Sequence, residues 1–138
     1  MLKNIPSVLS PELLKTLMEM GHGDYLVIGD GNFPAATNAK RLIRCDGHGV
    51  PEILDAILKL MPLDTYVENP VGLMDNGDPE NRPEIWAVYK DIIEKNEGER
   101  ALSLLKDSIF TIRQRVLSQL LQRAKQQSMQ TLFFKRVL

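Results

Sequence analysis

The chain of 138 residues is predicted to fold as one α/β domain. In some segments apolar residues recur every three or four positions, as on one face of a helix. These segments alternate with short apolar runs typical of strands. The length and the 43% hydrophobic content are sufficient for one buried core. We therefore expect a single domain over residues 1–138, in which helices pack against a sheet.

The helices are predicted from caps and from apolar spacing. The first helix starts with Ser10 as a hydroxyl N-cap and Pro11 at the first helical position, and it ends at Gly21. Two further helices are expected over residues 51–61 and 84–95. Each helix is expected to bury one apolar face. The first helix should bury Leu13, Leu14, Leu17 and Met18. The helix over 51–61 should bury Ile53, Leu54, Ile57, Leu58 and Met61, and the helix over 84–95 should bury Ile85, Trp86, Val88 and Ile92.

Short apolar runs predict strands at residues 25–28 and 42–44, and we expect a third strand at residues 65–67. Residues 29–39 are predicted to form a loop because they are rich in Gly, Asn and Ala. A longer loop, with a functional role, is expected over residues 68–83. Its loop-forming residues are Pro70, Gly72, Gly77 and Pro79.

Composition and charge exclude several classes of partner. The net charge of −1 gives no general attraction to nucleic acid or to anionic membranes. A single cysteine, Cys45, cannot form an internal disulfide and offers no metal cluster. No apolar run approaches the roughly 20 residues of a membrane helix, and no signal peptide is recognised. We therefore expect a cytoplasmic protein that needs no metal or other cofactor.

The clearest candidate for a functional site is His22, which lies between Gly21 and Gly23. The glycines allow the backbone to bend and keep neighbouring side chains away from a ligand. Imidazole titrates close to neutral pH, so a histidine near a carboxylate is well suited to proton transfer. A histidine here can also serve only as a cap for the preceding helix, and the spacing leaves both roles open. Asp24 is expected to hold the turn.

Two further candidates follow the strand at residues 25–28. Asp30 stands where α/β proteins gather ligand-binding groups, although an aspartate there can also form an Asx-turn. Phe33 can provide an apolar wall for a ligand or can pack the loop. His48 lies close to Cys45, but these residues and the aspartate between them cannot surround one metal ion with good geometry.

Four motifs, in this order and spacing, resemble the ribose-pyranase and fucose-mutarotase family of sugar-handling proteins. The resemblance is stronger to the fucose-mutarotase branch, and it covers residues 1–96 directly. The motifs are Ser-Pro-Glu-Leu-Leu-Lys from Ser10, Glu-Met-Gly-His-Gly-Asp from Glu19, Asp-x-x-Phe-Pro from Asp30, and Ile-Arg-x-Asp-Gly from Ile43.

The resemblance implies a three-layer domain with a small central sheet flanked by helices. It also implies an isomerase that interconverts the α and β anomers of L-fucose by general acid/base ring opening. In this interpretation His22 is the catalytic proton shuttle and Asp30 binds the sugar, with Phe33 as a second candidate for substrate contact. The family further implies a homo-oligomer, a decameric ring with its sites at subunit boundaries.

Three alternatives remain open at this point. The first is a D-ribose pyranase-type activity, since the sequence does not identify the sugar. The second is a sugar-binding or regulatory protein that retains the site without turnover. The third is a small helical interaction module that depends on the basic, glutamine-rich C-terminal segment.

From about residue 100 the chain is atypical for the family. Residues 117–130 are rich in Gln, Arg and Lys and predict an amphipathic helix. Members of the family are instead expected to end with an apolar strand, a Thr-Gly-Glu turn, a Tyr-x-Asn motif and a final strand.

The expected ending reappears when the codons are shifted to another reading frame. Codons for residues 119–131 then permit Ser-Val-Val-Ala-Thr-Gly-Glu-Thr-Ala-Lys-Tyr-Ala-Asn, and those for residues 132–138 permit Ile-Ile-Phe-Gln-Lys-Gly-Val. The printed residues constrain two bases of every shifted codon. We therefore expect a frame error that begins near residues 97–102. In the shifted frame the family's sugar-contacting arginine and Tyr-x-Asn motif fall near Lys106 and residues 128–130, so the printed residues there are assigned no role.

Overall fold

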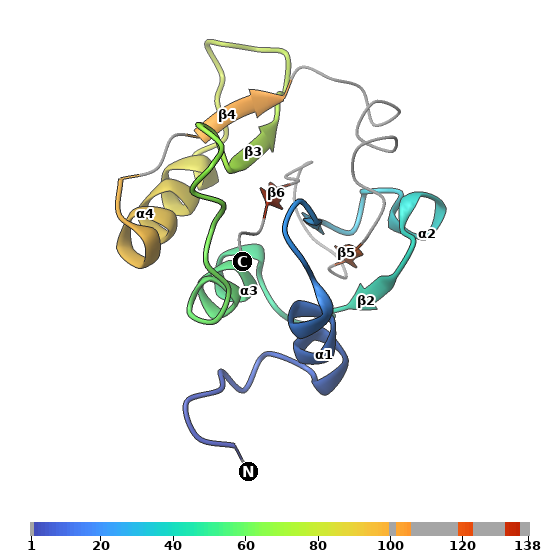
Figure 1. Ribbon diagram of the computed structural model, residues 1–138. Helices are drawn as coiled ribbons and strands as arrows, with labels where there is room; N and C mark the ends of the chain where they lie inside the picture. The colour runs from blue at the N-terminus through green and yellow to red at the C-terminus, as the bar shows by residue number, and fades with distance from the viewer. Residues whose placement is uncertain (1, 100–101, 106–118, 123–131, 136–138) are drawn as a thin grey trace.

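A six-stranded mixed sheet lies at the centre of the computed structural model, which describes residues 2–99, 102–105, 119–122 and 132–135 (Figure 1). Its strand order is β2-β5-β1-β6-β3-β4. The strands are β1 (Tyr25–Gly29), β2 (Leu42–Arg44), β3 (Val71–Met74), β4 (Leu102–Leu105), β5 (Gln119–Gln122) and β6 (Leu132–Lys135). Strand β6 is antiparallel to its neighbours β1 and β3, and the other pairs are parallel.

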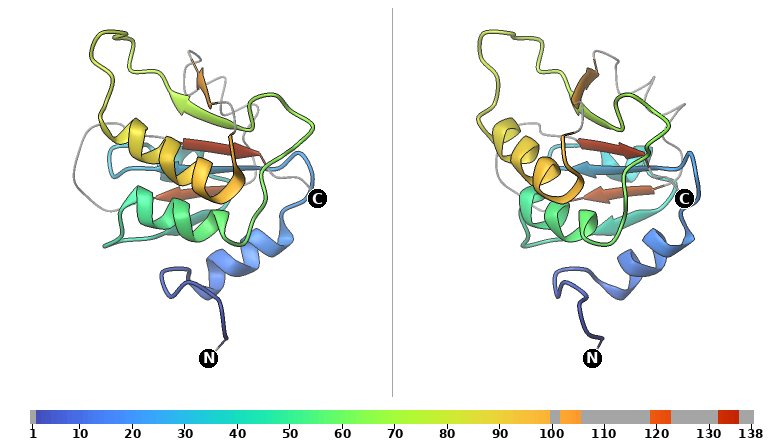
Figure 2. Two further views of the ribbon diagram at one scale, coloured as in Figure 1. Left: turned by 90° about the vertical axis from the view of Figure 1, so that its left-hand side faces the viewer. Right: turned by 60° about the vertical axis from the view of Figure 1, so that its left-hand side comes forward.

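Every strand of this sheet except β6 therefore runs in the same direction. We call the edge at which β1 to β5 end the carboxyl edge, and the edge at which they begin the amino edge. Strand β1 begins at Tyr25 on the amino edge and ends at Gly29 on the carboxyl edge. The two edges lie on opposite sides of the domain in Figure 2.

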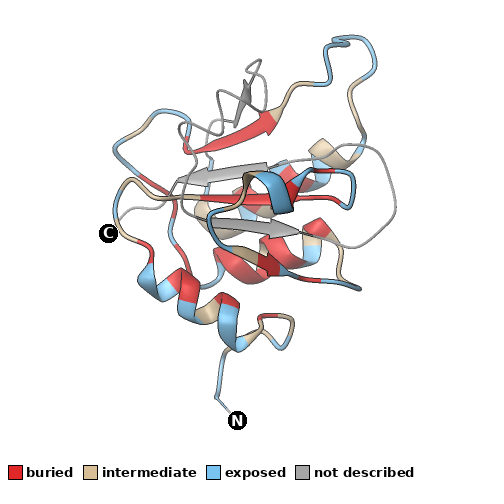
Figure 3. Cartoon of the chain, turned by 90° about the vertical axis from the view of Figure 1, so that its right-hand side faces the viewer, coloured by how far each residue is buried: buried red, intermediate tan, exposed pale blue. Residues whose placement is uncertain are grey.

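Helices cover both faces of the sheet. The helices α3 (Val50–Leu58) and α4 (Ile85–Glu97) pack side by side on one face, and the single turn of α2 (Ala35–Asn38) lies on the other (Figures 2 and 3). Helix α1 (Pro11–Glu19) packs against the residues that follow α3. The predicted α/β class and the three-layer arrangement are confirmed.

The larger core cluster lies between the sheet and the helices α1, α3 and α4, and a smaller one lies on the side of α2. Strand β1 contributes to both, because Leu26 and Ile28 join the larger cluster while Val27 joins the smaller one. Successive side chains of a strand point to opposite faces, so a strand buried on both faces needs a continuous apolar run. This requirement explains the sequence Tyr-Leu-Val-Ile.

Local capping explains where α1 begins and ends. The hydroxyl of Ser10 accepts a hydrogen bond of 3.1 Å from the backbone N–H of Leu13, and Pro11 occupies the first helical turn, as predicted. The helix ends one residue before Met20, whose N–H still donates to the Thr16 carbonyl. On this helix Leu13 and Leu17 are buried, as predicted, whereas Met18 is exposed.

Two predicted elements are wrong. Residues 65–67 form bends, and the strand lies further on as β3. Gly72 and the preceding proline indicated a loop, but Gly72 is buried and pairs within the sheet, so the tertiary environment outweighs the local preference. The helix expected over residues 117–130 is contradicted at 119–122, which form β5 between β1 and β2. The rest of that range lies outside the described residues.

Smaller differences concern the burial of α4 and the loops. Val88 is exposed, while the fully buried residues of α4 are Tyr89 and Ile93, so the buried face is rotated relative to the prediction. The loop predicted over residues 29–39 contains α2. Within the described part of the chain, no helix has the length and apolar character needed to cross a membrane.

Asp55 joins α3 to α4 through its carboxylate. Its Oδ2 lies 2.5 Å from Lys59 Nζ, and its Oδ1 accepts a hydrogen bond of 3.0 Å from Asn96 Nδ2 and lies 3.5 Å from Lys95 Nζ. The hydrogen bonds from Lys59 and Asn96 lower the pKa of Asp55 to about 2 from its usual 3.8. The ionised carboxylate is therefore the form that the fold stabilises.

We predict that Asp55→Ala lowers the free energy of unfolding at pH 7 by about 1–2 kcal/mol, because it removes the hydrogen bonds that the Asp55 carboxylate accepts from Lys59 and Asn96 at a partly exposed site. A lowered carboxyl pKa stabilises the fold above the unfolded pKa, and this contribution is lost as the pH falls through the folded value. The difference from wild type should therefore shrink between pH 4 and pH 2. Urea titrations at several pH values measure it. Asp91→Ala, an exposed carboxylate on α4, is the control, and an equal effect of both substitutions would contradict the prediction.

Candidate functional site

His22 lies on the amino edge, in the turn that connects α1 to β1. The turn is closed by Asp24, whose Oδ2 accepts a hydrogen bond of 2.8 Å from the Gly21 N–H. Gly23 adopts φ 86°, a backbone conformation that glycine accommodates without strain. The structural role predicted for Asp24 is confirmed. The turn leaves the His22 side chain 53% exposed, so its imidazole is accessible to a ligand.

A buried carboxylate accompanies this histidine. Asp64 is fully buried, and its Oδ2 lies 3.8 Å from His22 Nδ1. This separation is longer than a direct hydrogen bond but within the range of an ion pair. The other oxygen, Oδ1, accepts a hydrogen bond of 2.8 Å from the backbone N–H of Tyr66. A carboxylate fixed beside Nδ1 is placed to orient the imidazole ring.

The Tyr66 ring completes the group on the amino edge. Its centroid lies 5.8 Å from that of His22, with an interplanar angle of 83°, which is an edge-to-face contact. Neither Asp64 nor Tyr66 was predicted from the sequence as a site residue. They are distant from His22 in the sequence, so no motif spacing links them. The one available signal was an acidic residue directly after Leu63, within an apolar segment.

Asp30 lies on the opposite, carboxyl edge, directly after β1. It is only 2% exposed. Its Oδ1 accepts hydrogen bonds from the backbone N–H groups of Asn32 (2.9 Å) and Phe33 (3.1 Å), which is the Asx-turn considered from the sequence. Its Oδ2 is buried and has no hydrogen-bond partner among the described residues. An unpaired buried oxygen of this kind is costly, and it offers an acceptor to a ligand.

Phe33 belongs to the smaller core cluster, with Val27 and Ala35. It packs so closely on Gly29 that a Cβ at that position would lie 2.9 Å from the Phe33 ring. The packing role is therefore observed, and contact with a substrate stays a prediction for Phe33.

His22 and Asp30 do not meet within one chain. The five residues of β1 stand between them in extended conformation, which separates the two edges by about 13 Å at about 3.3 Å per residue. Figure 2 shows β1 crossing the domain from one edge to the other. One monosaccharide therefore cannot contact both side chains of the same chain.

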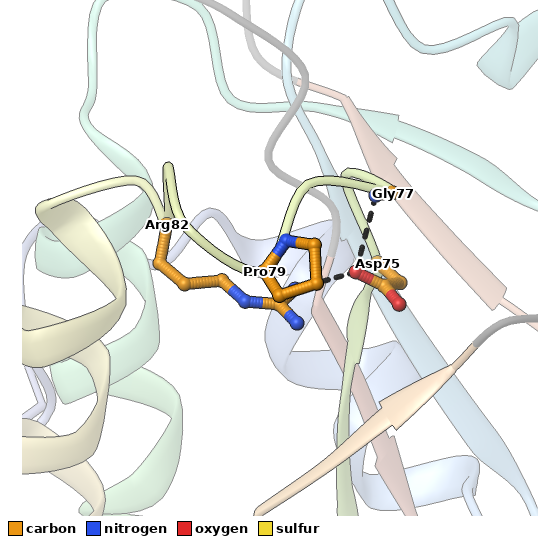
Figure 4. Close-up of a pocket in the computed structure, with 4 residues that line it drawn as sticks. All are labelled: Asp75, Gly77, Pro79 and Arg82. Carbon is orange, nitrogen blue, oxygen red and sulfur yellow. Dashed lines mark hydrogen bonds and ion pairs between the residues drawn. The ribbon is translucent and has the colours of Figure 1, made fainter.

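The long loop expected to be functional begins on the carboxyl edge after β3. A pocket of about 400 Å³ there is lined by Asp75, Gly77, Pro79 and Arg82 (Figure 4). Asp75 Oδ1 accepts hydrogen bonds from the Gly77 N–H and from Arg82, and the Arg82 guanidinium lies 5.2 Å from the centre of the Trp86 ring. These contacts give the loop a defined shape. Since β1 and β3 both end on this edge, the pocket and Asp30 share it.

The remaining candidates have structural partners. His48 Nδ1 lies 3.0 Å from Glu52 Oε2 on the surface, and Arg44 forms a two-point ion pair with Asp46, as expected for a structural pairing. Burial, with the nearby charge of Asp46, raises the pKa of the Cys45 thiol. No group of three or more His, Cys, Asp or Glu residues suited to a metal ion occurs in the described ranges.

Comparison with known proteins places this arrangement in a family. The profile of the RbsD / FucU transport protein family matches residues 3–128. The chain belongs to this family. It is 44% identical over 112 residues to the fucose mutarotase of Homo sapiens, an alignment that covers 76% of the chain and 73% of the human protein.

Two solved structures of the RbsD/FucU family resemble the chain along its length. One is the fucose mutarotase of Streptococcus pneumoniae in complex with L-fucose, with a TM-score of 0.88 and 38% identity over 99% of each chain. The other is FucU of Bifidobacterium longum, with a TM-score of 0.87 and 40% identity over 99% of each chain. The family predicted from the four motifs is therefore confirmed.

Proposed function

We propose that the chain is a mutarotase that interconverts the α and β anomers of L-fucose, an isomerase acting on a carbohydrate. The observation that carries the proposal is the His22–Asp64 pair, exposed at the imidazole and buried at the carboxylate, in a fold that matches a fucose mutarotase bound to L-fucose. The similar proteins are named for fucose, which favours L-fucose over D-ribose and catalysis over binding alone. A cytoplasmic location stays a prediction.

The reaction needs only proton transfers. A proton leaves the anomeric hydroxyl and another reaches the ring oxygen as the bond from that oxygen to the anomeric carbon breaks; rotation of the open-chain carbonyl and the reverse steps give the other anomer. A positioned acid or base contributes on the order of 10² to 10⁴-fold. His22 is the proton shuttle, and Asp64 orients its ring.

Asp30 binds the sugar. Its Oδ1 holds the turn, whereas its buried Oδ2 has no described partner and can accept a hydrogen bond from a sugar hydroxyl. A hydrogen bond to an ionised carboxylate is stronger than one between neutral groups, so it fixes the orientation of the sugar.

The opposite positions of His22 and Asp30 require two copies of the chain. One sugar can contact both groups only where the amino edge of one copy meets the carboxyl edge of another. Such a head-to-tail contact joins two different surfaces, and it closes into a ring when the rotation between copies allows. This supports a homo-oligomer with its sites at subunit boundaries, and a decameric ring is the size that we propose. Exposed Met18, on the helix that leads to His22, gives a second copy an apolar surface to cover.

The segment beyond residue 100 supports the proposed frame error. Strands β5 and β6 flank β1, at the two positions where the shifted codons give Ser-Val-Val-Ala and Ile-Ile-Phe-Gln. The sequence alignment to the human protein covers 76% of the chain, whereas the structural match to the Streptococcus pneumoniae protein covers 99%. The structural similarity therefore extends over more of the chain than the sequence similarity does. A single domain over residues 1–138 follows from this interpretation. The strand at 119–122 also argues against an interaction module built on a C-terminal helix.

We predict that the intact mass of protein expressed from the natural gene differs from the 15.6 kDa of the printed sequence. A frame error changes nearly every residue after its position, so peptides from the C-terminal third should match the shifted codons. Mass spectrometry of the whole protein and of its tryptic peptides measures both. A mass and peptides equal to those of the printed sequence would contradict a misread gene.

We predict that the protein accelerates the exchange of L-fucose anomers and that His22→Ala removes most of this acceleration, on the order of 10² to 10⁴-fold. Saturation-transfer NMR on L-fucose and on D-ribose measures exchange without any coupled enzyme. His48→Ala is the matched control, since the other histidine is paired with Glu52 on the surface and should leave the rate unchanged. Binding of L-fucose without catalysed exchange by wild type would instead support the sugar-binding alternative.

We predict that two inactive variants restore each other's activity when they share an oligomer. Asp30→Asn keeps the Oδ1 acceptor of the turn and removes the charge, whereas His22→Ala removes the shuttle. In a random mixture about a quarter of head-to-tail boundaries combine an intact His22 with an intact Asp30, so about a quarter of wild-type activity should return. Co-expression with two affinity tags isolates the mixed oligomer. A verified mixed oligomer without recovered activity would mean that the site does not span two copies.

A further inference from the structure

Tyr66 is an exposed aromatic residue held beside the proton-transfer pair. It is 80% exposed, although a tyrosine ring usually packs its apolar body against other groups. Its backbone N–H donates to Asp64 Oδ1, and its ring contacts that of His22. The residue is therefore connected to both members of the pair, through its main chain to one and through its side chain to the other.

The surroundings of Tyr66 do not explain an aromatic residue by packing. The residue belongs to neither core cluster of the described chain, and its neighbours Thr65 and Glu68 are also exposed. The hydrogen bond to Asp64 uses only the backbone, so any residue except proline would supply it. The ring thus belongs to neither core cluster of the described residues, and its described ring contact is with His22.

We infer that Tyr66 is a specificity-determining residue, whose ring supports the apolar face of the sugar bound at His22. The inference rests on the proposed function for the identity of the substrate. On one face of L-fucopyranose the hydrogens of carbons 3, 4 and 5 lie together, next to the methyl group on carbon 5. The flat, apolar face of an aromatic ring is complementary to such a surface. The rings of Tyr66 and His22 stand at 83° to each other, so the tyrosine does not stack flat on the imidazole.

The methyl group makes this contact testable by comparison with a sugar that lacks it. D-Arabinose in its pyranose form has the ring configuration of L-fucose and lacks the methyl group. A ring that contacts the methyl-bearing face favours L-fucose over D-arabinose, and loss of the ring brings the two sugars closer together in affinity. The phenolic hydroxyl has no part in this contact, so phenylalanine should replace tyrosine.

The test compares wild type, Tyr66→Phe and Tyr66→Ala on both sugars. We expect Tyr66→Ala to raise the KM and the Kd for L-fucose by about tenfold, the upper range for an aromatic contact, with kcat nearly unchanged. Its effect on D-arabinose should be smaller, and Tyr66→Phe should resemble wild type. Saturation-transfer difference NMR, with the aromatic protons irradiated, should show transfer to the methyl group that Tyr66→Ala loses.

The outcomes separate this inference from the proposed function. Catalysed exchange by wild type together with an unchanged Kd in Tyr66→Ala would overturn the specificity role and leave the mutarotase intact. A fall in kcat without a change in KM would also overturn it, because the ring would then only orient His22. Binding that depends on Tyr66 in a wild type without catalysed exchange would support the contact and refute the mutarotase.

Discussion

The arrangement of the site depends on β1, which is buried on both faces and paired on both sides. Its neighbours are β5 and β6, and its side chains enter both core clusters, so it cannot bend or shift without disturbing the whole domain. The strand holds His22 before its first residue and Asp30 after its last. The length of one short strand thus decides that His22, the proposed proton shuttle, and Asp30, the proposed sugar-binding carboxylate, belong to opposite edges.

Asp30 and Asp64 each have one carboxylate oxygen that accepts backbone hydrogen bonds and one that does not accept them from the described residues. In Asp30 one oxygen closes the turn with two backbone N–H groups, and the other stays buried without a described partner. In Asp64 one oxygen is held by the Tyr66 N–H, and the other faces the imidazole. In both cases backbone hydrogen bonds fix the side chain, so the remaining oxygen is positioned for the role proposed for it. Such preorganisation avoids a reorganisation cost at the moment of reaction.

Local signals in the sequence were sufficient for α1, β1 and β2, because caps and apolar periodicity act over a few residues. They failed at β3, where Gly72 forms a strand only because neighbouring strands bury it, and at α4, where packing against α3 selects Tyr89 rather than Val88. His22 and Asp30 could be singled out from their turns. Asp64 could not, since its proximity to His22 exists only after the loop before β3 returns to the amino edge. The separation of His22 from Asp30 also follows from the length of a folded strand rather than from a motif.

The proposed division of the site between two edges would couple assembly to activity. In the proposed site, each edge of a lone copy presents only one of the two groups, His22 at the amino edge and Asp30 at the carboxyl edge. Because each edge can engage a different neighbour, every copy in a closed ring takes part in two boundaries, and none is left with an unmatched edge. An open arrangement leaves one amino edge and one carboxyl edge unused. For the proposed site, ring closure is therefore the arrangement that gives each His22 an Asp30 from another copy, and this geometric demand, rather than stability alone, supports the proposed closed oligomer.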